Sequence, residues 1–199
     1  MTGPVVGRAV VASKNPDKIA EMEHLLVASG VIGEIVTGLE WPDVVEDATT
    51  LEGNARLKAR AVSERTGLAS IADDTGLEVD ALGGAPGVHT ARFSGPDATY
   101  ESNVSVLLGT LANVENRGAR FRTVVIAILA DGSEVVAEGV LPGEIAHHPR
   151  GSGGFGYDPV FAVGSRTLAE MPADEKNLIS HRARAIRGLA EALRQLRVR

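Results

Sequence analysis

Apolar residues along this chain follow two periods, one typical of strands and one typical of helices. The apolar run at 9–12 predicts a buried strand, and the polar segment SKNPDK at 13–18 predicts the turn that follows it. Apolar residues then recur at helical spacing over 19–26, with Asn15 suited to the N-cap and Pro16 to the first helical position. The first part of the chain is therefore predicted to be a strand, a polar turn and a helix.

The later pattern predicts more strands and helices in alternation. Residues 69–72 form a short apolar run, which we expect to be a strand that ends at Asp73 and Asp74, before a turn at 75–76. A long hairpin is expected around the turn pair at 131–132, because two apolar runs flank it. The other predicted elements are a short strand over 33–38 and helices over 50–65, 100–111 and 180–196. Interleaved strands and helices predict an α/β fold with a mixed sheet.

Composition and charge exclude some of the protein classes that this pattern allows. The chain has 199 residues, of which 44% are apolar, and this length predicts a single domain over residues 1–199. Its 20 basic and 26 acidic residues give a net charge of −6, which argues against general binding of nucleic acid. There is no cysteine, so any metal must be bound by oxygen or imidazole ligands.

Nothing in the apolar pattern predicts insertion into a membrane. The longest apolar run, 124–130, is far shorter than the ~18 residues of a membrane span. The first residues, MTGPVVGRAVV, also lack the basic region and long apolar stretch of a signal peptide. We therefore expect a cytoplasmic protein with no membrane partner.

The turn at 13–18 has the chemistry of an anion site. Ser13 offers a hydroxyl, Lys14 and Lys18 offer ammonium groups, and the first turn of a helix exposes backbone N–H groups. The segment matches neither the Walker pattern nor G-x-G-x-x-G, so a capped helix with solvated lysines is the alternative.

Acidic residues supply the groups that a cation-mediated phosphate site would need. Glu46 lies in an irregular segment ahead of a predicted helix, and Asp73 and Asp74 are expected at a strand end. Adjacent carboxylates repel each other, and a hard divalent cation such as Mg²⁺ would relieve that repulsion. The alternative is that Asp73 caps a turn and Asp74 is solvated.

Two later segments could recognise a nucleobase. The loop GSGGFGYD at 151–158 allows close approach of its backbone to a ligand, and Phe155 could stack on a base or else fill the core. The run Ser-His-Arg at 180–182 offers hydrogen-bond donors at the start of the last helix, with Lys176 four residues before it. Otherwise the serine of this run is only an N-cap.

Taken in order, five segments resemble the inosine/xanthosine triphosphate pyrophosphatases, a family of house-cleaning nucleotide hydrolases. They are ASKNPDK, EDATTLEGNARLKA, ADDTGLEVDALGGAPGVHTARFSG, GFGYDPVF and EKNLISHRARA. The resemblance implies Mg²⁺-dependent hydrolysis of dITP, ITP and XTP to the monophosphate and pyrophosphate, which keeps these nucleotides out of DNA and RNA. It also implies a homodimer, with a long central mixed sheet, flanking helices and two lobes around an active-site cleft.

The resemblance also assigns roles to the residues that fall on its motifs. Asp74 is implied as the catalytic residue and, with Glu46, as a metal ligand, although it stays open whether Asp73 or Asp74 is the general base. Leu51 and Gly53 depart from the usual motif, where an aromatic and an acidic residue are common. The implied substrate-binding residues are Ser13, Lys14, Asn15, Pro16, Asp17, Lys18, Lys58, Thr75, Phe155, Gly156, Tyr157, Asp158, Lys176, His181 and Arg182.

Selectivity for these bases has a physical explanation. Hypoxanthine and xanthine carry a 6-keto acceptor where adenine carries an amino donor, so donors such as Arg182 or loop N–H groups would be left without a partner by adenine. Two alternatives stay open from the residues: a pyrophosphatase for pyrimidine or modified-base triphosphates, and a non-catalytic nucleotide sensor.

Overall fold

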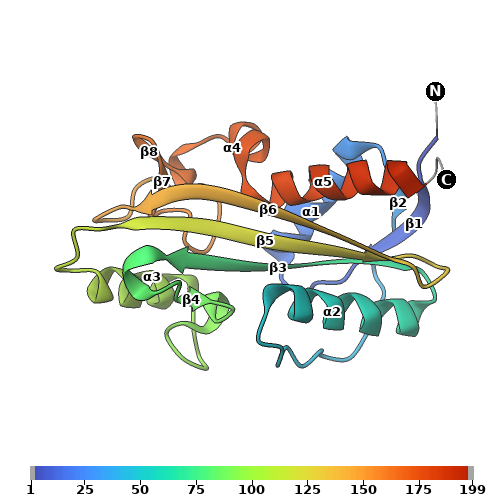
Figure 1. Ribbon diagram of the computed structural model, residues 1–199, viewed down its shortest axis with the longest axis horizontal. Helices are drawn as coiled ribbons and strands as arrows, with labels where there is room; N and C mark the ends of the chain where they lie inside the picture. Colours follow the sequence, from blue (N-terminus) through green and yellow to red (C-terminus); the bar gives the residue numbers. More distant parts are fainter. Residues whose placement is uncertain (1–2, 197–199) are drawn as a thin grey trace. The chain divides into compact units, whose positions relative to one another are not determined.

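The computed structural model describes residues 3–196 and shows a mixed α/β fold (Figure 1). Within this range, eight strands form one sheet in the order β2-β1-β3-β5-β6-β7-β8, with β4 paired to β3. The sheet is mixed because β1 runs parallel to β2 and β3, whereas β4, β7 and β8 pair antiparallel with their neighbours. The strands are β1 (Val6–Val11), β2 (Ile32–Ile35), β3 (Ala69–Val79), β4 (Pro86–Gly87), β5 (Gly118–Ile128), β6 (Glu134–Ile145), β7 (Phe161–Val163) and β8 (Arg166–Thr167). The helices are α1 (Pro16–Ser29), α2 (Leu51–Thr66), α3 (Tyr100–Thr110), α4 (Ala173–Ile179) and α5 (His181–Leu196).

The chain divides into two compact units. Unit 1 comprises the described residues up to 74 together with 123–139 and 182–196, and unit 2 comprises 75–122 and 140–181. Strands β3, β5 and β6 each have residues in both units. A single domain over residues 1–199 stays a prediction.

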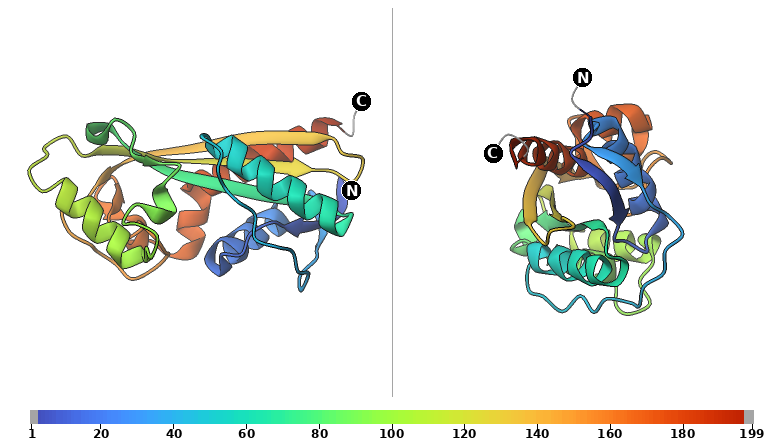
Figure 2. Two further views of the ribbon diagram at one scale, coloured as in Figure 1. Left: turned by 90° about the horizontal axis from the view of Figure 1, so that it is seen from below. Right: turned by 90° about the vertical axis from the view of Figure 1, so that its right-hand side faces the viewer.

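Unit 1 contains helices on both sides of its strands (Figure 2, right). Helices α1 and α5 share one buried cluster, in which Met22 and Leu26 pack with Leu189 and Leu193 over the strands. Helix α2 lies on the other side, where it buries Ala55, Ala59 and Val62. The parallel strands of unit 1 are therefore covered on both faces, which is usual for βαβ connections.

Unit 2 has its own core around the parts of the long strands that belong to it, which are 75–79 of β3, 118–122 of β5 and 140–145 of β6. Leu107 of α3, Phe121 of β5 and Phe161 of β7 belong to one buried cluster, together with Tyr157. The rings of Phe121 and Phe161 lie 4.6 Å apart, a favourable distance for an aromatic pair. This core supports the glycine-rich segment that carries Phe155.

Most of the predicted elements are confirmed, and two need correction. The prediction that a strand ends at Asp73 is wrong, because β3 continues to Val79 through the expected turn at 75–76. Leu77 and Val79 are buried beyond the expected turn, so the apolar run at 69–72 and the residues after the turn form one strand. The short helix α4 was missed. In the described part of the chain, no helix has the length and apolarity needed to cross a membrane.

Candidate active site

The turn after β1 places polar groups at the first turn of α1. The Asn15 side chain caps the helix, because its Oδ1 accepts from the backbone N–H groups of Asp17 and Lys18, at 2.9 and 3.1 Å. Pro16 occupies the first helical position as predicted. The N–H groups of Asp17 and Lys18 are thus satisfied by Asn15, so attraction for an anion falls mainly to the lysine side chains.

The two lysines of this turn have different surroundings. Lys14 forms an exposed ion pair with Asp43, on the irregular segment before α2. Lys18 is mostly buried, with Nζ 3.7 Å from Asp73 Oδ2. A hollow of about 210 Å³ opens beside the turn, within unit 1; it is lined by Ala12, Ser13, Lys14, Trp41, Asp43, Val44, Glu46 and Lys58.

The adjacent acidic residues of β3 have separate partners. Asp73 Oδ2 accepts from Arg182 Nε and Nη2, at 3.1 and 3.0 Å, on the side of α1 and α5. Asp74 Oδ2 accepts from Asn54 Nδ2 of α2, at 3.3 Å. Successive side chains of a strand point to opposite faces, so the two carboxylates are directed apart. The expectation that one cation relieves their mutual repulsion is therefore wrong.

A different pair of carboxylates converges on one position. Lys58 Nζ lies 2.8 Å from Glu46 Oε2 and 3.4 Å from Asp74 Oδ1. Lys58 and Asn54 stand four residues apart on α2, which places both side chains on the same face of the helix. Asn54 also accepts from the backbone N–H of Ala48 at 3.0 Å, so it fixes the segment that carries Glu46. Glu46 and Asp74 are thereby brought together.

The charges of this region set the protonation of its carboxyl groups. Burial opposes ionisation of Asp73, yet the nearby charges of Lys18 and Arg182 hold its pKa well below the usual value. Burial raises the pKa of Asp74, and Glu46 adds to that effect. For Lys58, burial favours the neutral form, but the charges of Asp74, Asp73 and Glu46 outweigh it and raise the pKa.

The donor set fits a magnesium ion. Mg²⁺ is usually held by one or two carboxylates, with phosphate oxygens and water as its other ligands. Glu46 and Asp74 supply two such carboxylates around a position that already attracts a cationic group, the Lys58 ammonium. Among residues 3–196, no group of three acidic or histidine side chains is placed to hold a metal.

In unit 2, the glycine-rich segment is held by a buried ion pair. Asp158 Oδ2 accepts from Lys176 Nζ at 2.7 Å and from the backbone N–H of Phe155 at 2.9 Å. Gly154 has φ +69°, and a Cβ at this position would lie 2.0 Å from Asp158 Oδ2, so glycine is required there. Lys176 Nζ also lies 5.1 Å from the centre of the Phe155 ring, a cation–π distance.

The other predicted substrate-binding residues occupy more varied positions. Tyr157 is buried in the core of unit 2, where its hydroxyl donates to the carbonyl of Thr90 at 3.0 Å. His181 is buried with its ring 4.6 Å from that of Phe121. Gly156 is in the loop with φ +63°, and Thr75 follows Asp74 on β3. Tyr157 thus serves the core, while Phe155 is only partly buried.

Three residues near these groups were not assigned a role by the sequence analysis. Asn54 belongs to a quoted motif, but only the fold shows that it bonds Asp74. Glu21 pairs with Arg182, and its position on the same face of α1 as Lys18 is the only sequence signal for it. Tyr100 lies 5.9 Å from the Phe155 ring, beside a hollow of about 480 Å³, and the sequence gives no signal for this contact.

Comparison with known proteins agrees with the segments that carry the resemblance. The model of the Ham1 family matches residues 9–192. The chain belongs to the Ham1 family. This membership confirms the resemblance drawn from the motifs.

Relatives in this family align over nearly the whole chain. A dITP/XTP pyrophosphatase of Streptomyces coelicolor is 43% identical over 196 residues, which are 95% of this chain and 98% of that protein. One from Streptococcus pyogenes is 47% identical over 92% of this chain, but the alignment covers only 57% of that longer protein. The solved structure of a HAM1 protein from Coxiella burnetii has a TM-score of 0.84 at 39% identity, covering 95% of this chain and 99% of that chain.

Proposed function

We propose that this Ham1-family protein hydrolyses non-standard purine nucleoside triphosphates, dITP, ITP and XTP, to the monophosphate and pyrophosphate. The observation that carries the proposal is the convergence of Glu46 and Asp74 on the Lys58 ammonium, where Glu46 and Lys58 line a hollow together with Ser13 and Lys14 of the turn. Such an arrangement suits a metal-bound triphosphate in a protein with a negative net charge. The near full-length relatives named dITP/XTP pyrophosphatases support the choice of substrate.

Residues of unit 1 are assigned to the phosphates. Mg²⁺ held by Glu46 and Asp74 supplies positive charge to the triphosphate oxygens when it is bound. We assign Lys18 and Lys58 to supply further positive charge, which stabilises the negative charge that develops on the transferred group. Following the resemblance, we assign Asp74 to orient or deprotonate the attacking water, a role that a carboxylate can fill.

Residues of unit 2 are assigned to the base. Phe155 offers a partly buried ring for stacking, and Asp158 with Lys176 fixes the backbone of the loop that carries it. Recognition of the 6-keto oxygen falls to donors in the loop at 153–158 and at His181, since the Arg182 guanidinium donates to Asp73 and Glu21. Following the resemblance, we further propose that the protein is cytoplasmic and forms a homodimer. Light scattering of the purified protein would test the dimer.

A panel of nucleoside triphosphates with Mg²⁺ tests the proposal. The purified protein is assayed on dITP, XTP, dATP, dGTP, dCTP and dTTP, with separate detection of pyrophosphate and phosphate. We expect pyrophosphate release with strong preference for dITP and XTP. Preference for a pyrimidine would favour the alternative substrate class, release of phosphate would place cleavage at the γ position, and binding without turnover would indicate a sensor.

A further inference from the structure

A buried chain of charges connects α1 to β3. Glu21 of α1 forms an ion pair with Arg182 Nη1, and the exposed fractions of the two side chains are 9% and 2%. The same guanidinium donates to Asp73 Oδ2 through Nε and Nη2, at 3.1 and 3.0 Å. Glu21, Arg182 and Asp73 thus form a continuous series of charge-assisted bonds on one side of β3.

The charge balance of this group depends on Glu21. Arg182 and Lys18 both lie beside Asp73, so two cations share its single negative charge. Charged groups that are removed from water need compensating charge close by. Glu21 supplies the second negative charge, which balances the group and holds the guanidinium in place.

The position of Asp73 also affects its neighbour. Asp73 and Asp74 are adjacent on β3 and point to opposite faces, so fixing one carboxylate restricts the rotation of the backbone that carries the other. On the opposite face, Asp74 bonds Asn54 and lies 3.4 Å from Lys58. The two sets of partners together hold this part of the strand from both sides.

We propose that Glu21 is a positioning residue: through Arg182 it fixes Asp73, and through the shared backbone it keeps the Asp74 carboxylate aligned for the reaction. This inference rests on the proposed function, because the reaction is the one assigned to Asp74. Groups that orient a metal ligand from outside typically contribute 10- to 100-fold to activity, which sets the expected size of the effect.

The first test measures dITP hydrolysis by Glu21→Gln, which removes the charge and keeps the size. We expect kcat to fall about 10- to 100-fold, with KM within about threefold of wild type. In an Arg182→Lys background the same substitution should cause no further loss, since Glu21 acts through Arg182. Glu23→Gln is the matched control, because it removes the same charge from the same helix. Glu23 lines a separate hollow of unit 1. An unchanged kcat, or losses that multiply in the double variant, would overturn the proposal.

A second test does not depend on activity. The Arg182 Nε–H signal in a ¹⁵N NMR spectrum is identified by its absence in Arg182→Lys, and we expect it to shift or broaden in Glu21→Gln but not in Glu23→Gln. An unchanged signal in Glu21→Gln would overturn the proposal even if the wild type failed to hydrolyse dITP, which is the separate failure of the proposed function. If Glu21→Gln does not fold, Glu21→Asp, which retains the charge on a shorter side chain, is judged by the same criteria.

Discussion

Replacing Asp73 with asparagine tests the energetics of the buried charges directly. Its carboxylate is 1% exposed and accepts two hydrogen bonds from Arg182, with Lys18 Nζ at 3.7 Å. Asparagine keeps the shape of the side chain but removes the negative charge, which leaves Arg182 and Lys18 with less compensation. Removing one partner of a buried ion pair typically costs about 3–5 kcal/mol in the free energy of unfolding.

The size of this loss makes it simple to measure. A domain of this length loses about 2–4 °C in melting temperature per kcal/mol, so Asp73→Asn should melt about 6–20 °C below wild type. Circular dichroism during heating at pH 7 is the assay. The matched control is Asp43→Asn, which breaks the exposed ion pair with Lys14 and should leave the melting temperature nearly unchanged.

The pH dependence gives an independent check of the same reasoning. Because the folded-state pKa of Asp73 lies below the unfolded value of 3.8, its ionised form stabilises the fold above that pH. This stabilisation is lost as pH falls from about 4 towards the lower folded-state pKa. Asp73→Asn should therefore lose less stability than wild type over that acidic range. A variant that melts within 2 °C of wild type at pH 7 would refute the account of Asp73 as the central anion of this group.

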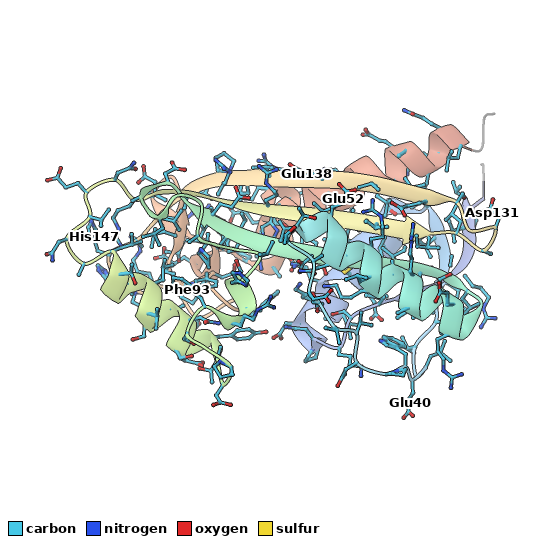
Figure 3. The ribbon with its side chains drawn as sticks, turned by 60° about the horizontal axis from the view of Figure 1, so that its bottom comes forward. Glu40, Glu52, Phe93, Asp131, Glu138 and His147 are labelled. Carbon is cyan, nitrogen blue, oxygen red and sulfur yellow. The ribbon has the colours of Figure 1, made fainter. Side chains whose placement is uncertain are left out.

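Three further substitutions test the assigned roles. Asp74→Asn should reduce pyrophosphate release at least about 100-fold while the melting temperature is kept, because the charged form of this carboxyl is disfavoured by burial; retention of a tenth of the activity would contradict the role. Glu46→Gln should raise the Mg²⁺ concentration needed for half-maximal activity, whereas Glu40→Gln, whose exposed side chain points outward from the same segment (Figure 3), should not. Gly154→Ala should raise KM for all purine substrates, since its Cβ would clash with the carboxylate of Asp158. An unchanged KM would show that this loop does not bind the base.

Side chains with local signals were placed correctly from the sequence. Asn15 and Pro16 have strong preferences at a helix start, and the structure confirms both positions. The hairpin turn at Asp131 is similarly local, and Figure 3 shows this residue at the end of the paired strands β5 and β6. Prediction failed at Asp73, because a charged pair normally marks the end of a buried strand unless distant residues supply partners for it.

The sequence by itself determined the alternation of strands and helices, the polar turn after β1 and the membership of a family, since these depend on periodicity, local capping and ordered motifs. Only the tertiary structure decided which charges meet. Arg182 is 109 positions from Asp73 in the chain and 161 from Glu21, yet all three are joined by ion pairs in unit 1. A buried charge needs a partner of opposite charge close by, and here the partners lie on other elements. The local sequence around each residue does not show which distant residue will be that partner. The direction of Asp73 and Asp74 to opposite faces was likewise decided by the continuation of β3, which depends on pairing with neighbouring strands.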